Sequence, residues 1–302
     1  MNKQYCGYVS IIGKPNVGKS TIINALLNKK VSITSRKSQT TRNNIIGFKT
    51  KKNKQMILID TPGMHIKSQK TMNKILNKSA QSIIEDADII LLVLQRLTLE
   101  KEDELIIKKI KNTNQKIICV INKIDQIENK NKLLPFIEKI SSYDFFDEIL
   151  PISAKTKDGI DLLENLIMNN LPENMHIYSG RDLTIHEDSI FMISELIREK
   201  IIRKLGDELP HDIFVEIDML DKKNNLTEVH ATIFVNRKSQ KQIVIGSRGD
   251  ILKKIGKQAR LEIESYINKK VFLKTWVKVK KNWNTDSGFI QSLGVGGNYD
   301  AK

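Results

Sequence analysis

The stretch GKPNVGKS, Gly13 to Ser20, decides the fold of the first half of this 302-residue chain. It matches the phosphate-loop pattern G-x-x-x-x-G-K-[ST], follows the apolar run 8–12 and opens a segment with helical spacing at 20–27. By average composition, a chance match in a chain of this length occurs on the order of one time in a hundred. The stretch therefore predicts a strand, a loop and a helix that together bind phosphate groups.

Each position of this loop has a physical role. Gly13 and Gly18 let the backbone turn and approach phosphate oxygens closely, while the loop N–H groups point at those oxygens. Lys19 supplies positive charge to the β- and γ-phosphates, and Ser20 is a ligand for Mg²⁺. We expect nucleotide contacts along the whole stretch, from Gly13, Lys14, Pro15, Asn16, Val17, Gly18, Lys19, Ser20 and Thr21.

Short apolar runs alternate with helical patterns through the first half of the chain. This alternation is typical of an α/β fold with a mainly parallel sheet. Residues 45–54 are compatible with an additional strand and a hairpin. The expected strands are 8–12, 56–59, 89–93, 117–121 and 148–151, and the expected helices are 20–27, 71–85, 102–111, 133–140 and 160–168.

A second motif, LIDTPG, follows the loop at the end of an apolar strand. Asp60 stands where a carboxylate can hold the metal shell, and Gly63 offers a backbone N–H to the γ-phosphate. On its own, DTPG is an ordinary Pro-Gly turn, so the upstream loop gives it its weight. The predicted nucleotide contacts in this segment are Asp60, Thr61, Pro62, Gly63 and Met64.

The segment VINKID places Asn122, Lys123 and Asp125 just after another predicted strand. An aspartate here accepts hydrogen bonds from the N1–H and exocyclic amine of guanine, whereas adenine would leave it unpaired. The next strand is followed by SAK, Ser153 to Lys155. The N–H of Ala154 is positioned to meet guanine O6, with Lys155 packing over the base. The base is therefore predicted to be guanine.

The second half of the chain begins with a break after Leu171, and its element order differs. We expect a helix at 189–205, strands at 214–220 and 229–235, and a segment at 242–245 before a second glycine loop. A helix at 250–268 and a strand at 271–280 complete the order helix, strand, strand, helix, loop, helix, strand.

Positive charge is concentrated in this second half. The chain has a net charge of +15 and a pI of about 9.6, and residues 237–281 hold fourteen Lys and Arg against three Asp and Glu. Such a surplus favours a polyanionic partner, with nucleic acid first and an anionic membrane second.

The second glycine loop, GSRG at 246–249, stands between two helical segments beside a predicted three-stranded sheet. This is the KH arrangement, whose loop clamps the backbone of single-stranded RNA. Asp250 puts a negative charge beside the proposed contact unless it caps the helix. The alternative is a simple helix-joining turn with a solvated face of lysines. The predicted RNA contacts are Ile245, Gly246, Ser247, Arg248, Gly249, Leu252, Lys253, Lys254 and Lys257, with bases in an apolar groove near Ile243, Ile245 and Leu252.

Taken together, these motifs resemble the Era family of bacterial GTPases over nearly the full length. The motifs that carry the resemblance are GKPNVGKST, SITSRKSQTTR, DTPGMH, NKID, SAK, VIGSRGDILKKIG and KTWVKVKKNW. The resemblance implies a GTPase domain at 1–172, a linker at 173–188, a type II KH domain at 189–283 and a tail at 284–302. It also implies a GTP-hydrolysing switch that binds single-stranded small-subunit ribosomal RNA and assists assembly of the small ribosomal subunit.

The resemblance further assigns roles around the triphosphate. It favours Thr41 over Thr40 as the switch residue, which gives a Mg²⁺ set of Ser20, Thr41 and Asp60 and catalytic positions at Lys19, Thr41 and Gly63. Met64 stands where Ras-like enzymes carry a glutamine that orients water. We therefore expect slow intrinsic hydrolysis, with water held by backbone groups. The resemblance also implies that Asn16 helps to hold K⁺ in place of an arginine finger.

Two cysteines, Cys6 and Cys119, form no disulfide framework and favour a reducing compartment. The start lacks the long apolar core of a signal peptide, and the longest apolar run, 89–94, is too short to span a bilayer. A cytoplasmic monomer is expected, while the resemblance adds peripheral membrane association. Two other functions stay open: a GTP-dependent switch whose basic domain binds anionic lipid, and a non-hydrolysing RNA-binding module in which GTP is structural.

Overall fold

The structure is a computed structural model that describes residues 3–33, 45–60, 85–178, 189–205 and 213–281. These residues fall into two compact units. Residues 3–32, 45–60 and 85–178 form the first, and residues 189–205 and 213–281 form most of the second. Several sequence predictions lie outside the described residues: the switch loop with Thr40 and Thr41, the helix 71–85 except for its last residue, the tail 284–302, and Thr61, Pro62, Gly63 and Met64 of the second motif.

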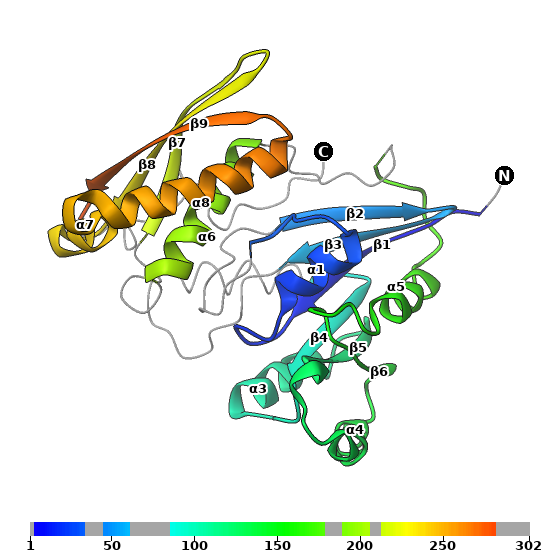
Figure 1. The fold of residues 1–302 in the computed structure, drawn as a ribbon. Helices are drawn as coiled ribbons and strands as arrows, with labels where there is room; N and C mark the ends of the chain where they lie inside the picture. The colour runs from blue at the N-terminus through cyan, green and yellow to red at the C-terminus, as the bar shows by residue number, and fades with distance from the viewer. Residues whose placement is uncertain (1–2, 34–44, 61–84, 179–188, 206–212, 282–302) are drawn as a thin grey trace. The chain divides into compact units, whose positions relative to one another are not determined.

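The first unit is built on a six-stranded sheet in the order β2-β3-β1-β4-β5-β6 (Figure 1). All neighbours are parallel except β2, which forms an antiparallel hairpin with β3. The five predicted strands and the hairpin are confirmed. Their bounds are β1 Tyr5–Ile12, β2 Ile45–Lys51, β3 Lys54–Asp60, β4 Ile89–Gln95, β5 Lys116–Asn122 and β6 Glu148–Pro151.

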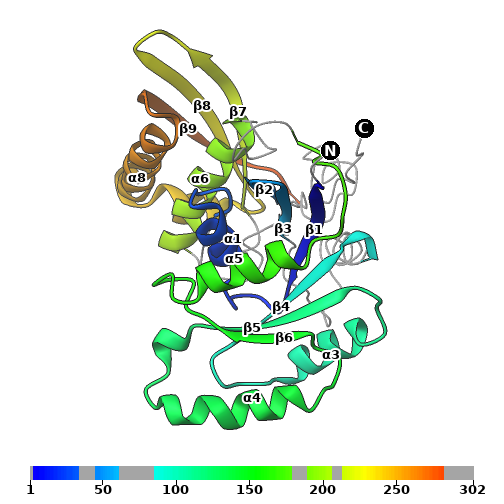
Figure 2. The same ribbon diagram turned by 90° about the vertical axis from the view of Figure 1, so that its right-hand side faces the viewer.

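Helices cover both faces of this sheet (Figure 2). Helices α1 and α5 pack together over β3, while α3 and α4 bury their apolar side chains against β4 and β5 on the opposite face. Because both faces are covered, the middle strand β4 reads IILLVLQ, an almost continuous apolar run rather than an alternating one. The helix bounds are α1 Lys19–Leu27, α3 Lys101–Ile110, α4 Leu133–Ser141 and α5 Ile160–Asn169.

The first strand is the point where the strand order reverses. Strand β1 has β3 on one side and β4 on the other. The connections on the two sides of β1 run in opposite directions, and they leave a crevice at the end of β1. In open α/β sheets ligands bind at this place, outside the carboxyl ends of the strands. The stretch Gly13 to Ser20 begins directly after β1, and the topology therefore puts the predicted phosphate loop at the usual ligand-binding edge.

Residues 173–178, which belong to the predicted linker, are held by the first unit. The side-chain oxygen of Gln55 in β3 accepts hydrogen bonds from the N–H groups of Ile177 and Tyr178, at 2.9 and 3.0 Å. The ring of Tyr178 stacks on that of Phe48 with 4.8 Å between centroids. Because these contacts join residues more than a hundred positions apart, a local composition of Pro, Gly and polar residues could not indicate them.

In its described residues, the second unit has a three-stranded sheet and three α-helices. Its order, helix, strand, strand, helix, helix, strand, is that of a type II KH domain, as predicted. Strand β8 lies between β7, to which it is antiparallel, and β9, to which it is parallel. The bounds are α6 Ser189–Leu205, β7 Ile213–Lys222, β8 Leu226–Val235, α7 Lys238–Ile245, α8 Asp250–Ile267 and β9 Lys270–Val279.

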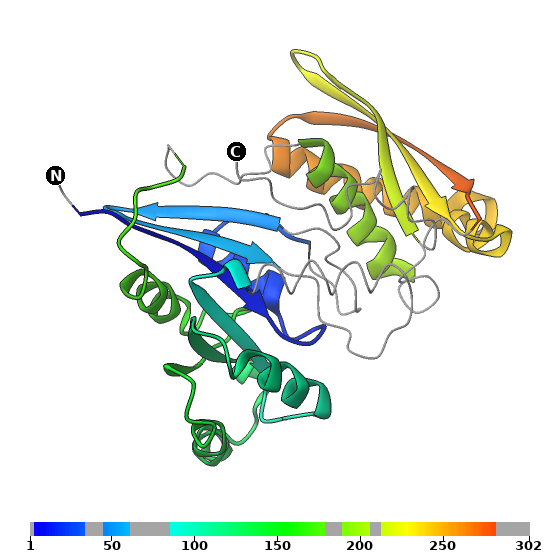
Figure 3. The same cartoon turned by 180° about the vertical axis from the view of Figure 1, so that it is seen from behind.

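One face of this sheet forms the core of the second unit. Figures 1 and 3 show α6 and α8 on the same side of the sheet. Ile193 and Ile197 of α6 and Ile255 of α8 are buried against strand residues such as Val229 and Ile233. Along the described parts of the chain, no helix is both long enough and apolar enough to cross a membrane.

Gly256 offers a test of the α8 assignment. A Cβ at this position would meet no atom within 4 Å, and its φ is not positive. Because alanine loses less backbone entropy than glycine in a helix, Gly256→Ala should stabilise the protein by about 0.5–1 kcal/mol. Urea unfolding followed by tryptophan fluorescence measures this.

Gly246 provides the matched contrast. Its φ is +75°, and an added Cβ would lie 2.5 Å from Cγ1 of Ile251. Gly246→Ala should therefore destabilise the protein in the same assay. Destabilisation by Gly256→Ala would contradict the assigned course of α8.

Candidate functional site

The phosphate loop has a backbone conformation that its glycines make possible. Gly13 and Gly18 have φ values of +149° and +107°. A Cβ on Gly13 would lie 2.6 Å from the carbonyl oxygen of Val93, and one on Gly18 only 2.2 Å from Nδ2 of Asn122. Both positions therefore require glycine for space as well as for conformation. The loop is pressed against the ends of β4 and β5.

Lys19 lies inside the curve of this loop. Its ammonium group donates hydrogen bonds to the carbonyl oxygens of Gly13 and Lys14, both at 3.0 Å. Burial lowers the pKa of Lys19 to about 8, although the nearby negative charge of Asp60 acts in the opposite direction. Among the described residues its hydrogen-bond acceptors are neutral carbonyl oxygens, so this buried cation is poised to bind an anion. Pro15 and Thr21 lie on either side of it, in the loop and in the first turn of α1.

Two of the three predicted metal ligands lie together. The buried carboxylate of Asp60, at the end of β3, accepts a hydrogen bond from the hydroxyl of Ser20 at 2.8 Å. Hydroxyl and carboxylate oxygens are the hard donors that Mg²⁺ prefers, and this ion usually keeps further positions for water and substrate phosphates. The donor set of Ser20 and Asp60 therefore fits Mg²⁺. The third predicted ligand, Thr41, lies outside the described residues.

A residue that the sequence analysis missed joins this group. The hydroxyl of Ser32 also donates to Oδ2 of Asp60 at 2.8 Å. Asn24 of α1 fixes this segment, because its side-chain oxygen accepts from the N–H groups of Val31 and Ser32 and its amide donates to the Ser32 carbonyl at 2.7 Å. The only signal in the sequence was the position of Ser32 at the start of SITSRKSQTTR.

The end of the site predicted to bind the base is tied to the loop by Asn122. Its amide group donates to the carbonyl oxygen of Val17 at 2.8 Å, and its side-chain oxygen accepts from the N–H of Ala154 at 3.0 Å. One buried side chain thus brings together the three motifs GKPNVGKS, NKID and SAK. The Ala154 N–H, predicted to meet guanine O6, is engaged by Asn122 in this structure.

Asp125 and Ser153 also meet as a pair. The hydroxyl of Ser153, which is buried, donates to Oδ1 of the exposed Asp125 at 2.7 Å. A hydrogen bond from a fixed hydroxyl orients the carboxylate and leaves acceptor capacity on its outer side. Lys155 is exposed on the same loop as Ser153. The two predicted base-reading motifs therefore converge on one edge of the sheet.

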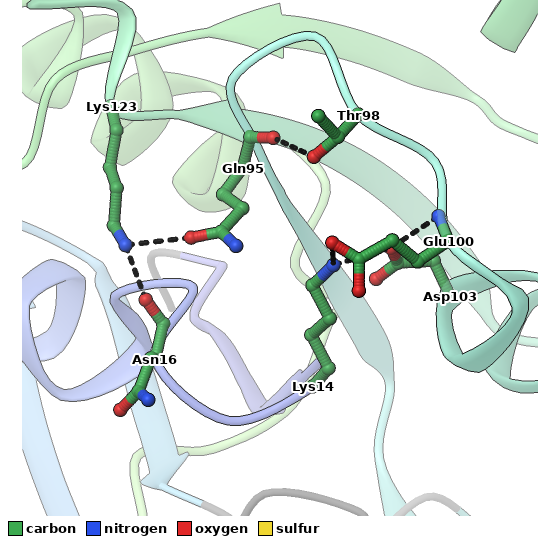
Figure 4. Close-up of polar contacts among 7 residues, drawn as sticks. All are labelled: Lys14, Asn16, Gln95, Thr98, Glu100, Asp103 and Lys123. Carbon is green, nitrogen blue, oxygen red and sulfur yellow. Dashed lines mark hydrogen bonds and ion pairs between the residues drawn. The ribbon is translucent and has the colours of Figure 1, made fainter. Parts of the chain in front are cut away.

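Lys123 braces the phosphate loop from the side (Figure 4). Its ammonium group donates to the backbone carbonyl of Asn16 and, at 2.7 Å, to Oε1 of Gln95 at the end of β4. Asn16 has a positive φ of 66°, and Figure 4 shows its side-chain amide pointing away from Lys123. Lys123 thus supports the loop, and its predicted nucleotide contact stays a prediction.

Lys14 is engaged with α3. Its buried ammonium group forms ion pairs with Glu100 at 2.9 Å and Asp103 at 3.0 Å (Figure 4). Burial on its own would lower the pKa of Lys14, but these two carboxylates outweigh it and raise the pKa. Any contact of Lys14 with a nucleotide is therefore left to its backbone. Glu100 and Asp103, which cap the start of α3, escaped the sequence analysis because their partner lies far away in sequence.

In the second unit, the GSRG loop has three residues with positive φ: Gly246, Arg248 and Gly249 at 75°, 52° and 82°. Ser247 and Arg248 are exposed. Gly249 is the N-cap residue of α8, and no side chain caps this helix. The suggestion that Asp250 caps the helix is therefore wrong. Asp250 is the first residue of α8, where its carboxylate lies 3.9 Å from the ammonium group of Lys254.

The other predicted RNA contacts divide into two kinds. Lys253, Lys254 and Lys257 are exposed on α8, beside Arg248. The apolar members, Ile243, Ile245 and Leu252, are partly buried and pack against the core of the second unit. The structure thus has a basic surface at the start of α8. The apolar residues lie at the edge of the core of the second unit.

A phosphate loop at the switch point of a parallel sheet, joined by Asn122 to a guanine-type motif and followed by a G-x-x-G unit, defines a P-loop GTPase with a KH domain. Comparisons with known proteins agree. The family model described as 50S ribosome-binding GTPase matches residues 8–123, and the model described as KH domain matches residues 208–284.

Curated relatives cover nearly the whole chain. GTPase Era of Coxiella burnetii (strain Dugway 5J108-111) is 44% identical over 294 residues, 97% of this chain and 99% of the relative. GTPase Era of Pseudomonas syringae pv. tomato is 43% identical over 291 residues, 96% of this chain and 97% of the relative. The chain belongs to the GTPase Era family.

Solved structures give the same result. A variant of Aquifex aeolicus Era bound to GDP·AlF4⁻ matches with a TM-score of 0.92 and 35% identity, over 97% of this chain and 99% of that one. Era in complex with MgGDPNP and nucleotides 1506–1542 of 16S ribosomal RNA matches with the same values. The α/β GTPase fold followed by a KH domain is thereby confirmed, and the protein is a GTPase.

The lowered pKa of Lys19 makes nucleotide binding depend on pH. Phosphate oxygens stabilise the ammonium form, so binding raises a pKa that burial holds at about 8 in the free protein. Above that value the free protein must take up a proton to bind, and GDP affinity should fall by up to tenfold per pH unit. Below about pH 7 Lys19 is protonated in the free protein and adds nothing further to the pH dependence.

Calorimetry in two buffers of different ionisation enthalpy measures this proton directly. We expect more than half a proton to be taken up at about pH 8.5, where guanine N1 is still mostly protonated, and clearly less at about pH 7. Lys19→Arg is the control, because a guanidinium stays charged throughout. Equal uptake at both pH values would contradict the buried position of Lys19.

Proposed function

We propose that this chain is a GTP-hydrolysing switch that binds single-stranded small-subunit ribosomal RNA through its KH domain and takes part in assembly of the small ribosomal subunit. The observation that carries the proposal is the Asn122 side chain, which joins the phosphate loop to both base-reading motifs. The RNA part is supported by the matching Era structure, which holds nucleotides 1506–1542 of 16S ribosomal RNA. The protein would act in the cytoplasm as a monomer.

At the phosphate end, the chain supplies charge and positioning. Phosphoryl transfer passes through a loose transition state, so catalysis depends mainly on holding the triphosphate and neutralising its charge. Lys19 would exchange the carbonyls of Gly13 and Lys14 for phosphate oxygens, and the loop N–H groups would complete the cradle. Mg²⁺, held by Ser20, Asp60 and Thr41, would add positive charge between the phosphates.

Hydrolysis is expected to be slow without help. Met64, which follows DTPG, offers no hydrogen bond that could orient water, so backbone groups such as the N–H of Gly63 would hold it. We assign to Asn16, which is exposed at the tip of the loop, one oxygen ligand for K⁺ beside the phosphates. Turnover equally fast in sodium and potassium would contradict this assignment.

At the base end, Asp125 is proposed to select guanine. Its carboxylate, oriented by Ser153, accepts from N1–H and the 2-amino group of guanine. Asp125→Asn replaces one acceptor by a donor, which suits the carbonyl that xanthine carries in place of that amine. We expect GDP affinity to fall by about a hundredfold or more while XDP affinity rises.

The matched control for this prediction is Asp158→Asn. Asp158 is an exposed carboxylate of the neighbouring loop, between β6 and α5, and its backbone carbonyl accepts from Ser153 N–H. It should leave both affinities unchanged in a competition assay with a fluorescent nucleotide. A loss of GDP binding with no gain of XDP binding would mean that Asp125 supports the loop and does not read the base.

The KH domain is proposed to hold RNA through the exposed backbone of the GSRG loop. Arg248 adds charge there, together with the dipole of α8 and the lysines of its first turns. Arg248→Glu should weaken binding of a single-stranded RNA by about tenfold or more and leave GDP affinity unchanged. Fluorescence anisotropy with a labelled oligonucleotide measures this, with Lys108→Glu on the exposed side of α3 as the charge-matched control.

The same variants separate the two competing functions. If Arg248→Glu abolishes binding to anionic vesicles and spares RNA, the basic domain is a membrane-binding surface. If GTP turnover equals that of buffer with and without RNA, the nucleotide is structural and the protein is an RNA-binding module.

A further inference from the structure

Strand β9 presents a regular pattern on the outer face of the KH sheet. Because side chains alternate along a strand, Val271, Leu273 and Val277 point toward the helices and pack in the core. The residues between them lie on the opposite face, and all are exposed: Lys270, Phe272, Lys274, Trp276 and Lys278. We call these five residues the β9 strip.

The two aromatic side chains of the β9 strip are not used by the core. Phe272 is 49% exposed and Trp276 is 38% exposed. They are four residues apart in a strand, a spacing of about 13 Å. These two large rings are exposed on the same face of one strand, so both are available to stack with a flat ligand.

Neighbouring side chains orient the ring of Trp276. The His230 ring meets it edge-on with 5.4 Å between centroids, and the ammonium group of Lys274 lies 5.0 Å from its centroid. Because the His230 ring and the Lys274 ammonium group already hold the Trp276 ring, the ring loses little conformational freedom when a flat ligand stacks on it.

Charge is separated across this outer face. The β9 strip alternates three lysines with its two rings, while β7, the opposite edge strand, carries Glu216, Asp218 and Asp221. Glu228 of β8, the register partner of Phe272, is hydrogen bonded to His230 at 2.9 Å. Lysines on an edge strand also discourage pairing with other chains, but this does not explain the rings between them.

We propose that the β9 strip is a second binding surface for single-stranded RNA, in which bases stack on Phe272 and Trp276 and phosphates contact the lysines. Sheets that carry exposed aromatic residues bind two or three bases in this way, and stacking with a basic track is a general mode of single-strand binding. This inference rests on RNA being the partner in the proposed function. It adds a site that the GSRG loop does not supply.

The distribution of charge favours RNA over a lipid surface. A flat anionic membrane would meet the whole outer face, including the carboxylates of Glu216 and Asp218, whereas a narrow strand can follow β9 alone. The strip is also distinct from the GSRG loop, because that loop opens α8, and α8 covers the inner face of the sheet (Figure 3).

Trp276 itself reports on this site. The chain has two tryptophans, so Trp283→Phe leaves Trp276 as the sole fluorophore. Titration of this full-length variant with a single-stranded oligouridine should quench the Trp276 emission as a base stacks on the ring. Phosphatidylglycerol vesicles, tested separately, should leave it unchanged.

Affinity measurements complete the test. Phe272→Ala and Trp276→Ala should each weaken oligouridine binding by about fivefold or more, whereas Trp276→Phe should retain most of it. Lys274→Ala should lower the slope of log affinity against log salt by about 0.7, with Lys108→Ala as the control that changes nothing.

The outcomes separate this inference from the proposed function. If Arg248→Glu weakens RNA binding but RNA leaves the Trp276 emission unchanged, the β9 strip is not an RNA site and the proposed function stands. If RNA binding survives Arg248→Glu but quenches Trp276, the strip is supported and the role of the GSRG loop is overturned. A change of Trp276 emission with vesicles and none with RNA would make the strip a lipid-binding surface.

Discussion

The hydrogen bonds of the Asn122 side chain are the constraint on which the nucleotide site depends. The amide lies buried at the end of β5, with its donor on the Val17 carbonyl and its acceptor on the Ala154 N–H. A buried polar group with both ends satisfied fixes its neighbours, because either bond alone would leave an unpaired group in the interior. The phosphate end and the base end of the site are therefore one rigid piece. The same amide explains why position 18 is a glycine, since any larger residue there would collide with it.

Buried charge is the second property of this site. Lys19 and Asp60 lie close together in the interior, and Lys14 is neutralised by the carboxylates of Glu100 and Asp103 at the start of α3. Lys19 has only carbonyl oxygens as its described hydrogen-bond acceptors, which explains why burial lowers its pKa. An anionic ligand relieves this unfavourable state. The folded protein therefore already holds the buried positive charge in place before phosphate binds, which is electrostatic preorganisation.

Much of this could be predicted from the sequence, because the signals are local. Glycines at fixed offsets, apolar strands and the NKID segment each describe a few consecutive residues, and the structure brings them together as expected. Side chains that act over long sequence distances escaped prediction: Ser32 on Asp60, Gln55 on residues 177 and 178, and Asp103 on Lys14. Asp250 was misassigned for a local reason. Gly249, with its positive φ, takes the N-cap position, so α8 begins one residue earlier than it would with Asp250 as the cap. Asp250 is therefore the first residue of the helix, although its residue type suits an N-cap.

The central claim is that one chain couples guanine nucleotide to single-stranded RNA. Coupling is reciprocal, so RNA must change the relative affinity for GTP and GDP by the same factor by which nucleotide changes RNA affinity. The most direct measurement is the ratio of dissociation constants for GDP and a non-hydrolysable GTP analogue, without RNA and with saturating single-stranded RNA from the 3′ end of the small-subunit ribosomal RNA. We expect RNA to shift this ratio by about fivefold or more. A ratio that RNA leaves unchanged would contradict it.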